Sequence, residues 1–556
     1  MKHRFLLYSL LVLVVLGVLL PQATTFAISV TYVTCPTFAT LQADAENVGY
    51  PNTLTFNVPG GCTIDFGGDS IDVDGDLTIV NIGGTVVFEN ASYHIYIEDA
   101  TLTVDNIHFT GAFDYGAIYA ENSVVNISNS RFYNNYTAYD GGAIFAEDSA
   151  VTITNSVFDS NQADDYGGAI YQLFGEMTII GCHFENNEAL TDYGGAIYIE
   201  SATLTVENST FEGNYTSEES GGAIGGYDSN AWIMSSHFYD NYAYYGGAIE
   251  FDSSFVFIGY SSFYNNSAEY GGAIYNFYNT FMVITNSTIY GNYATEEGGG
   301  LINDDAEMGL IHVTLADNFA PIGANYQDYF AYAEFTATII INGDCAWDGT
   351  LVDGGYNIQF NAPDCVGTEI DPMLGAFTAG YLMPATGSPA IDAIPLVNCI
   401  MTDDQIGTSR PQDGGCDIGA IEVGDEVVVP VSPAGPEVLG CVFDTPSGMA
   451  IGNVPDNTYC TVLMRAGKVV NYPGAVPENL IELGVIMAVD VFRMDGGRSI
   501  TEFPTYGRIC LRGNGRMFYM DSRNAPRYPI EMSTERVDGM TCAWIPAPGT
   551  LILTER

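Results

Sequence analysis

A repeated alternation of apolar and polar residues runs through the middle of the chain. Leu102 and Val104 show it first, and from Val125 and Ile127 onward like pairs recur at intervals of 25 to 27 residues as far as Met308 and Leu310. Alternation with a period of two in β-branched residues predicts strands rather than helices. A small residue follows the second apolar position after three residues, as at Ser130, and Cys182 takes that place in one copy.

Two short motifs mark each copy of this pattern. Gly-Gly-Ala-Ile stands at 141–144, 167–170, 194–197, 221–224, 246–249 and 271–274. Phe-x-x-Asn stands at 132–135, 158–161, 184–187, 211–214, 238–241 and 263–266. A fixed period of this length is typical of a solenoid, in which each repeat packs on its neighbours.

These features predict an all-β protein whose main part is a parallel β-helix. Like strands of successive coils should pair in parallel about 4.8 Å apart, with Phe, Ile, Val and Ala columns in the core. Glycine and Asn tolerate the backbone conformations of the bends between strands. Stacked Asn amides should bond from coil to coil. The general preference for right-handed parallel crossovers predicts a right-handed helix.

The combination of Gly-Gly-Ala-Ile with Phe-x-x-Asn resembles the polymorphic outer-membrane protein repeat. That resemblance covers about residues 100–320 and implies a surface-displayed β-helix of the kind found in adhesins. The chain departs from that family at its end, because residues 441–556 do not show a dozen alternating strands. Transport through a barrel of its own is therefore not expected.

The stretch after the repeats is similar to the choice-of-anchor Q region of secreted β-helix proteins. The matching segments are Gly355 to Ile358, Asp371 to Gly375, Gly387 to Ala393, Arg410-Pro411 and Cys416 to Glu422. The resemblance implies that this region closes the solenoid and that the following tail attaches the protein to the cell envelope. Ile406 stands where that family usually has Arg.

The domain organisation follows from these patterns. We expect a signal peptide at 1–27, an N-terminal cap with the first coils at 28–85, and β-helix repeats at 86–344. The last coils and a C-terminal cap should occupy 345–423, a Pro- and Val-rich linker 424–440, and a small β-rich domain 441–556. Lys2 and Arg4 before an apolar stretch are typical of a secretory signal. No later segment reaches spanning length, so no transmembrane span is expected after signal removal.

Eleven cysteines fit an oxidising compartment. Neighbours in sequence suggest the pairs 35–62, 345–365, 399–416, 441–460 and 510–542, although connectivity cannot be derived from sequence alone. Cys182 should be a free, buried thiol. Localisation is therefore expected to be secreted or at the cell surface.

The net charge of −53 arises mainly from missing bases. Between Phe5 and Ser409 the only Lys or Arg is Arg131. Such an acidic surface repels nucleic acid and anionic membranes, so neither is expected as a partner. A uronate lyase, which needs Lys or Arg, is disfavoured by the same deficit.

Two columns beside the glycine turns are candidate sites. Acids cluster before the glycines, and calcium is predicted at Asp164, Asp165, Asp192, Glu218 and Glu219, since hard cations prefer oxygen ligands. A solvated acidic edge is the alternative. Tyrosines occupy the neighbouring column, and a ligand surface is predicted at Tyr166, Tyr193, Tyr245 and Tyr270. Simple stacking of these rings along the coils is the alternative.

The sequence favours a binding or structural surface protein, an adhesin whose partner is a surface glycan or a protein. A glycoside hydrolase on a pectin-lyase-like β-helix is the alternative, because hydrolysis needs only two carboxylates about 5 to 10 Å apart. No acid pair was recognised as departing from the repeat, so no catalytic residue is assigned. No cofactor other than calcium is expected. His108, His183 and His237 share a column before the Phe and should face outward.

Overall fold

The computed structural model describes residues 28–46, 52–217, 219–412 and 414–424, together with short segments between 450 and 554. The chain divides into two compact units, Met1–Glu426 and Val427–Arg556. The expected signal peptide, Glu218 and nearly all of the expected linker lie outside the described residues. Among the described helices, none is long and apolar enough to cross a membrane.

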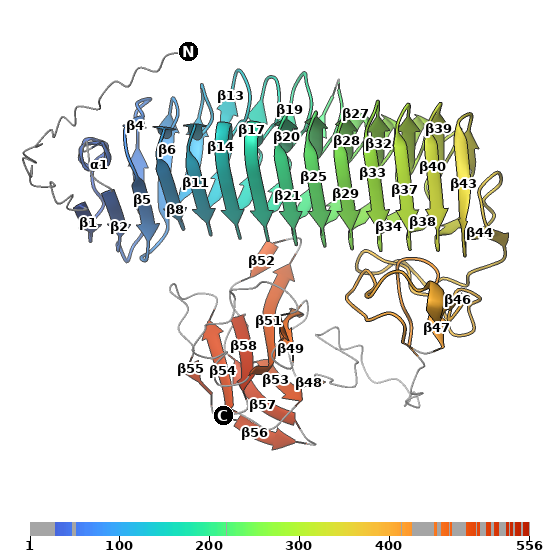
Figure 1. The fold of residues 1–556 in the computed structure, drawn as a ribbon. Helices are drawn as coiled ribbons and strands as arrows, with labels where there is room; N and C mark the ends of the chain where they lie inside the picture. Colours follow the sequence, from blue (N-terminus) through green and yellow to red (C-terminus); the bar gives the residue numbers. More distant parts are fainter. Residues whose placement is uncertain are drawn as a thin grey trace, which may run out of the picture. The chain divides into compact units, whose positions relative to one another are not determined.

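The first unit is a parallel β-helix, as the sequence predicts (Figure 1). Sheet A contains β1 (Ile28–Tyr32), β2 (Asn52–Phe56), β4 (Ile71–Val73), β5 (Leu77–Asn81), β7 (Ile95–Glu98), β8 (Thr101–Asp105), β10 (Ile118–Glu121), β11 (Val124–Ser128), β14 (Ile144–Thr154), β17 (Ile170–Ile180), β20 (Ile197–Glu200), β21 (Thr203–Glu207), β24 (Ile224–Tyr227), β25 (Asn230–Met234), β28 (Ile249–Asp252), β29 (Phe255–Gly259), β32 (Ile274–Phe277), β33 (Phe281–Thr285), β36 (Leu301–Asp304), β37 (Glu307–Ile311), β39 (Tyr326–Tyr329), β40 (Tyr332–Thr336), β42 (Cys345–Trp347) and β43 (Thr350–Gly355).

Two further parallel sheets complete the coils. Sheet B contains β3 (Cys62–Asp65), β6 (Val86–Ala91), β9 (His108–Ala112), β12 (Arg131–Tyr133), β15 (Val157–Asp159), β18 (His183–Glu185), β22 (Thr210–Glu212), β26 (His237–Tyr239), β30 (Ser262–Tyr264), β34 (Thr288–Tyr290), β38 (Thr314–Ala316), β41 (Ile339–Ile341), β44 (Ile358–Phe360) and β45 (Thr368–Glu369). Sheet C contains β13 (Tyr136–Thr137), β16 (Gln162–Ala163), β19 (Glu188–Ala189), β23 (Tyr215–Thr216), β27 (Tyr242–Tyr245), β31 (Ser267–Tyr270) and β35 (Tyr293–Glu297).

The Phe column forms the centre of the core. Phe158, Phe184 and Phe211 pair in register in sheet B and are fully buried. Their ring centroids lie 4.7 and 4.8 Å apart with nearly parallel planes. The predicted inward direction of Phe184 is therefore confirmed.

An Asn ladder runs beside the Phe column. Asn187 Nδ2 donates to Asn214 Oδ1 at 2.9 Å and to the carbonyl oxygen of Phe158 at 3.0 Å. The same pattern recurs in the column from Asn135 to Asn318. Each buried amide is thus satisfied by the neighbouring coils, which confirms the expected coil-to-coil bonding.

The small-residue column forms a second ladder. Ser209 Oγ accepts from the backbone N–H of Cys182 at 3.1 Å and donates to the carbonyl oxygen of Glu207 at 2.9 Å. Cys182 Sγ occupies the corresponding place one coil earlier, and the thiol is free and buried. Burial raises the pKa of Cys182 to about 12. The predicted packing role of this residue agrees with that environment.

The glycine turns allow close approach between coils. Gly221 has a φ of +71°, in the left-handed region that favours glycine. A Cβ on Gly222 would collide with the carbonyl oxygen of Gly247 in the next coil. The motif therefore repeats because both glycines are needed at the bend before sheet A.

The N-terminal end of the β-helix is covered by α1 (Phe38–Ala45). Thr37 Oγ1 caps this helix by accepting from the backbone N–H of Thr40. Leu41 and Ala45 are buried in the core cluster of the first coils, and the Phe38 ring packs on Phe66. The helix thereby shields a sheet edge that could otherwise pair with another chain.

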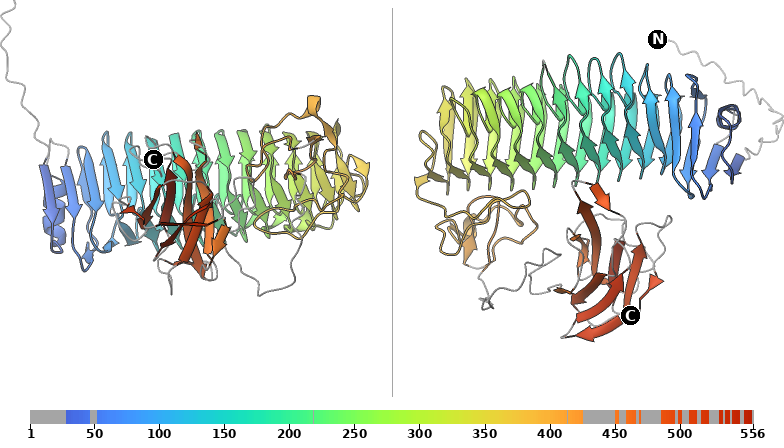
Figure 2. Two further views of the ribbon diagram at one scale, coloured as in Figure 1. Left: turned by 90° about the horizontal axis from the view of Figure 1, so that it is seen from below. Right: turned by 180° about the vertical axis from the view of Figure 1, so that it is seen from behind.

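Residues 369–423 fold back onto the outer side of sheet B (Figure 2). The segment contains β46 (Ile394–Pro395), the 3₁₀ turn Leu396–Asn398 and β47 (Gly415–Cys416). Gln405 Nε2 donates to the carbonyl oxygen of Ser261 at 3.1 Å, and Gln405 Oε1 accepts from Thr288 Oγ1 at 2.6 Å. Phe377 stacks on Tyr290 with centroids 4.2 Å apart. The segment therefore packs along several coils.

Charged residues within this segment neutralise one another. Arg410 and Glu422 form a fully buried ion pair of 2.9 Å. Arg410 Nη2 also donates to the carbonyl oxygen of Gly419 at 2.7 Å. Burial raises the pKa of Asp417 to about 7, although backbone hydrogen bonds to its carboxylate oppose the shift.

Three predicted disulfides are present, namely 35–62, 345–365 and 399–416. The pairs 441–460 and 510–542 involve residues whose side chains lie outside the description, although Cys510 and Cys542 are backbone partners in antiparallel strands.

The second unit is described through its strands, all of which pair antiparallel. One sheet contains β48 (Ala450–Gly452), β53 (Gly507–Arg512), β56 (Thr534–Val537) and β57 (Met540–Ile545). The other contains β49 (Thr458–Arg465), β50 (Lys468–Val469), β51 (Val485–Asp495), β52 (Arg498–Ile500), β54 (Arg516–Asp521), β55 (Ile530–Glu531) and β58 (Gly549–Thr554).

Candidate functional site

The repeat changes in the coil that contains Ser220 and Gly225. Ser220 lies between Tyr193 and Tyr245 in the column before the glycines. Gly225 pairs with Tyr198 of the preceding coil and with Glu250 of the next. Ser220 therefore lacks the aromatic ring that both neighbouring coils carry. Gly225 and Glu250 leave two coils without a ring between Tyr198 and Tyr275, so the ring ladder is interrupted.

The core compensates for this change on the inner side of the same strand. Gly226 faces inward, and the ring of Phe251 fills the space that its side chain would need. A Cβ on Gly225 would lie 3.0 Å from Tyr198 Cδ2 on the outer side. Gly226 thus leaves the core filled, and Gly225 lets the Tyr198 ring lean over the sheet beside an open space on the surface.

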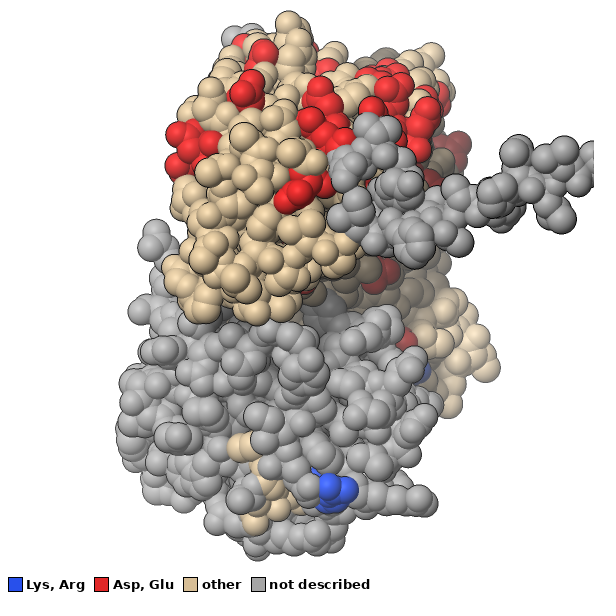
Figure 3. All heavy atoms as spheres, turned by 90° about the vertical axis from the view of Figure 1, so that its left-hand side faces the viewer, with Lys and Arg blue, Asp and Glu red and all other residues tan. Residues whose placement is uncertain are grey.

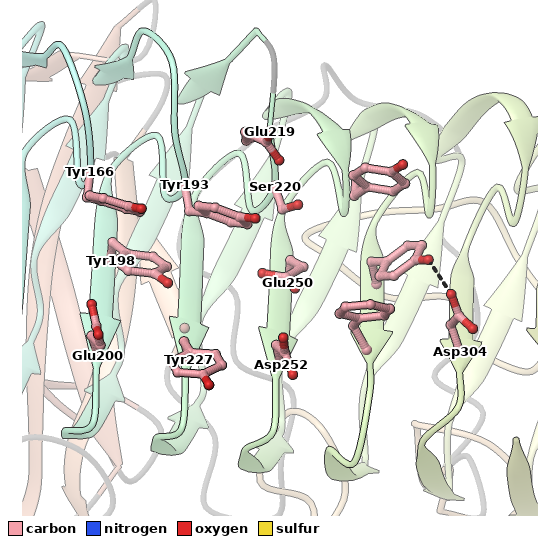
Figure 4. Close-up of a pocket in the computed structure, with 14 residues that line it drawn as sticks. Tyr166, Tyr193, Tyr198, Glu200, Glu219, Ser220, Tyr227, Glu250, Asp252 and Asp304 are labelled. Carbon is pink, nitrogen blue, oxygen red and sulfur yellow. Dashed lines mark hydrogen bonds between the residues drawn. The ribbon is translucent and has the colours of Figure 1, made fainter.

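That space is a groove of about 570 Å³ on the outside of sheet A (Figure 4). Three rows of side chains line it across successive coils. The upper row is Tyr166, Tyr193, Ser220 and Tyr245; the middle row is Tyr198, Glu250 and Tyr275; the lower row is Glu200, Tyr227, Asp252, Phe277 and Asp304. Glu219 lies beside Ser220 at the upper margin.

Aromatic rings stand on both sides of the interruption. On one side Tyr166 stacks on Tyr198 with centroids 4.8 Å apart, and Tyr193 lies 5.5 Å from Tyr198. On the other side Tyr245 and Tyr275 meet edge to face at 5.1 Å. These mutual contacts hold the rings in place, so the groove has preformed aromatic walls.

Hydrogen bonds fix two carboxylates of the lower row. Tyr171 donates to Glu200 Oε2 at 3.0 Å, and Tyr275 donates to Asp304 Oδ2 at 2.7 Å. Burial raises the pKa of Tyr275, and the contact with Asp304 adds to that shift. The phenol therefore stays protonated and remains a donor at neutral pH.

Glu250 lies at the floor of the groove, where its side chain is only 4% exposed. Among the described residues none donates a hydrogen bond to its carboxyl group, and no base pairs with it. Burial raises its pKa well above the usual value, and the negative charges of Asp252 and Glu219 raise it further. Glu250 is thus a buried acid without a partner that faces an open groove.

The predicted tyrosine surface coincides partly with this groove. Tyr166, Tyr193 and Tyr245 line it, whereas Tyr270 stacks on Tyr245 at 5.4 Å just beyond it. The rings stack along the coils, which was the alternative interpretation, and three of them also border open space. Their role in binding a ligand stays a prediction.

The predicted calcium residues lie nearer the turns of sheet C. Thr191 Oγ1 lies 3.4 Å from Asp165 Oδ1 and 3.5 Å from Asp192 Oδ2, and it donates to the carbonyl oxygen of Asp164. Burial raises the pKa of Asp192, and Asp165 adds to the shift. Among the described residues no three His, Cys, Asp or Glu side chains are arranged to hold a metal ion, and Glu218 is not described.

The calcium site therefore stays a prediction. Melting curves in millimolar Ca²⁺ and in NaCl of matched ionic strength would check it. We expect the larger rise with Ca²⁺, and a smaller difference in Asp165→Asn with Glu219→Gln.

The predicted histidine column lies on the outer side of sheet B. His183 Nε2 is 3.5 Å from Glu185 and 3.9 Å from Glu212, and its side chain is partly exposed. His237 Nδ1 lies 2.5 Å from Ser262 Oγ in the next coil. These contacts agree with the expected surface position.

Glu250, Gly225 and Ser220 are not among the site residues predicted from the sequence. The signal was present in the column after the Ile of Gly-Gly-Ala-Ile, which holds aromatic residues from Tyr119 to Tyr198, then Gly225, Glu250 and Tyr275. The prediction rests on the tyrosines of these columns, whereas Glu250 is the single acid in this otherwise aromatic stretch. The residues that depart from the repeat lie on the outer face of sheet A, and this face forms the groove.

Carboxylates also spread over the surface at the N-terminal end of the β-helix (Figure 3). Within residues 28–424 the only Lys or Arg are Arg131 and Arg410. Arg131 pairs with Asp159 at 2.5 Å, and Arg410 is buried against Glu422. Neither lines the groove, and the charged side chains among its described lining residues are all acidic.

The match to a protein-family model agrees with this architecture. The family model of the right-handed β-helix region matches residues 53–211 and 168–340, which together exceed half of the chain. No curated protein matches the sequence. Among solved structures, pectate lyase Pel9A is similar at 12% identity, with 68% of this chain and 90% of that chain covered and a TM-score of 0.24. The family matches confirm the predicted handedness, and the chain belongs to the right-handed β-helix family.

Proposed function

We propose that this protein is an extracellular glycan-binding protein that holds a sugar chain in the tyrosine-lined groove of sheet A. The observation that supports it most is the interruption of the ring ladder at Ser220 and Gly225, which leaves about 570 Å³ between aromatic walls. Sugar rings present C–H faces that stack on tyrosines, and their hydroxyl groups donate to carboxylates. The groove offers both kinds of contact.

Its placement outside the cell rests on separate observations. Three disulfides within the first unit are typical of an oxidising compartment. The likeness of the repeats to surface-displayed adhesins, and of residues 345–423 to a choice-of-anchor region, supports attachment to the cell envelope. Residues 441–556 would then serve as the attachment module or as a second binding domain.

A glycan array with the full-length mature protein tests this function, followed by calorimetry on each hit. Ser220→Tyr restores the residue of the neighbouring coils and should fill the groove and weaken binding at least tenfold. Tyr242→Ala is the matched control, because Tyr242 is an exposed ring that stacks on Tyr215 in sheet C outside the groove. Binding that survives Ser220→Tyr unchanged would contradict the proposal.

Glycoside hydrolysis is a second candidate, and Glu250 is the observation that favours it. A protonated carboxylic acid can give its proton to the leaving glycosidic oxygen, while a second carboxylate takes a proton from the attacking water. Asp252 lies on the same face two residues along β28, which places the two Cα atoms about 7 Å apart. Release of new reducing ends from a bound glycan, lost in Glu250→Gln, would identify an enzyme.

A further inference from the structure

The charged side chains that line the groove are all acidic. Five carboxyl groups line it, those of Glu200, Glu219, Glu250, Asp252 and Asp304, and none of its described lining residues is Lys or Arg. Like charges at this spacing repel one another unless a cation or a proton intervenes. A ligand that carries positive charge would relieve that repulsion, whereas a uronate chain would increase it.

Glu250 differs from the other acids of the groove in its hydrogen bonding. Asp304 and Glu200 already accept hydrogen bonds from tyrosines, and Asp252 Oδ1 accepts from Ser253 Oγ at 2.8 Å. The Glu250 carboxyl has no such donor among the described residues, although the residue is only 4% exposed. A buried polar group without a partner costs free energy that a bound donor can recover.

The side chains next to Glu250 define what kind of donor fits. Gly225 carries no side chain beside Glu250, and the Tyr198 ring leans over it, with Cδ2 3.0 Å from where a Cβ would lie. The open place next to the Glu250 carboxyl therefore lies in the groove between the Tyr198 and Tyr275 rings. An ammonium group in that place would form charge-assisted hydrogen bonds with the carboxylate and would lie close to aromatic faces. The sugar ring that carries the ammonium group would stack on the tyrosine walls.

We propose that the groove selects glycans with free amino groups, a de-N-acetylated amino-sugar chain, and places one ammonium group against Glu250 between the Tyr198 and Tyr275 rings. This inference rests on the proposed glycan-binding function and names its ligand class. An N-acetylated sugar has no positive charge to offer there, and its acetyl group needs additional room. A galacturonate chain brings negative charge against five carboxyl groups.

The test is calorimetry of the full-length mature protein with three short oligosaccharides of equal length, at low and high ionic strength. The probes are a glucosamine tetramer, an N-acetylglucosamine tetramer and a tetragalacturonate. We expect one site per chain for the glucosamine tetramer, at least tenfold tighter binding than for the N-acetylated tetramer, and no binding of the galacturonate. The preference should persist in high salt, because the ammonium group is enclosed.

Variants separate specific recognition from general attraction to an acidic protein. Glu250→Gln should abolish most of the preference for the free amine. Glu188→Gln removes one negative charge in sheet C, outside the groove, and should keep the preference. Ser220→Tyr should remove the site, and its melting temperature shows whether the chain is folded.

The possible results have distinct meanings. Equal affinity for the amino and N-acetylated tetramers overturns this inference and leaves glycan binding intact. Several weak sites for the glucosamine tetramer that are unaffected by Glu250→Gln and Ser220→Tyr overturn it as well, since they indicate general electrostatic attraction. Absence of binding to these tetramers and to every glycan of the array overturns the proposed function itself.

Discussion

The inner and outer sides of sheet A treat the repeat differently in the coils from Asp192 to Asp304. Inside, Ile197, Ile224, Ile249 and Ile274 follow one another without change, and all are fully buried. Outside, the column that begins with Tyr198 continues as Gly225, Glu250 and Tyr275. The regular side supports the fold, and the irregular side carries the unsatisfied acid and the open space. In a solenoid, departures from the repeat are therefore informative about function.

The largest effect should come from breaking the regular side. Phe184→Ala removes a fully buried ring between two stacked neighbours and should lower the free energy of unfolding by about 3–5 kcal/mol. Phe184→Leu should cost much less, because Ile289 and Leu315 occupy the same column and are also fully buried. Urea denaturation of the mature protein measures both. Equal small effects would contradict the central place of this ring.

A smaller loss should follow from interrupting the Asn ladder. Asn214→Ala leaves the amide of Asn187 without its acceptor and the carbonyl oxygen of Phe184 without a donor. We expect a loss of about 2–4 kcal/mol from these buried unpaired groups. Asn126→Ala, on the outer side of β11, is the matched control and should change stability by less than about 0.5 kcal/mol. A loss no greater than that of the control would show that the ladder is not stabilising.

On the irregular side, a substitution should increase stability rather than decrease it: Glu250→Gln should be more stable than the wild-type protein at neutral pH. Because the pKa of Glu250 is raised in the folded protein, the folded state keeps a proton that the unfolded chain releases above about pH 4.5. The wild-type protein should therefore lose stability as pH rises above that value, relative to Glu250→Gln, and the two should be alike in more acidic solution.

Thermal melts of both proteins from pH 4 to pH 8 measure this difference. Glu188→Gln serves as the control for the loss of one acidic side chain outside the groove. Parallel pH profiles of wild type and Glu250→Gln would show that Glu250 is solvated and that the groove floor is misassigned.

The smallest effect should come from Cys182. Cys182→Ser places at this position the same residue as in the neighbouring coils, where Ser156 and Ser209 stand. The free energy of unfolding should therefore change by less than about 1 kcal/mol. The native protein should show no reactive thiol at this position, and denaturation should expose one. Rapid alkylation of Cys182 in the native state would contradict its burial.

Sequence alone was sufficient where a residue's place follows from the coil period. The inward direction of Phe184, the Asn and Ser ladders and three disulfides all follow from repetition or proximity in sequence. The groove could have been inferred in part, since Gly225 and Glu250 stand out in an aromatic column, but its openness depends on the lean of Tyr198 and the volume of Phe251. The orientation of the Tyr198 ring and the packing of Phe251 cannot be read from an alignment of the repeats.

The position of residues 369–423 is a different case. Gln405 contacts Thr288 and Ser261, which are 117 and 144 residues earlier in the chain. No periodicity connects these positions, and the resemblance to an anchor region implied only that the solenoid is closed. Contacts of this kind arise from the shape and hydrogen-bonding groups of sheet B, which exist only once the coils have assembled.

The direction of the Asn ladder has a consequence for how the rod is built. Each amide nitrogen from Asn135 onward donates to the carbonyl oxygen of the Asn one coil later, so every finished coil displays a donor for the next. When the chain is synthesised from its N-terminus, each folded coil therefore offers a hydrogen-bond donor on which the next coil can form. Asn325 ends the series, because its Nδ2 donates to the backbone carbonyl oxygens of Ile341 and Gly343 instead of another Asn. The coils from β40 to β45 follow Asn325 without this donor, and the coils before Asn135 also form without it, so the Asn ladder orders the assembly of the middle of the rod.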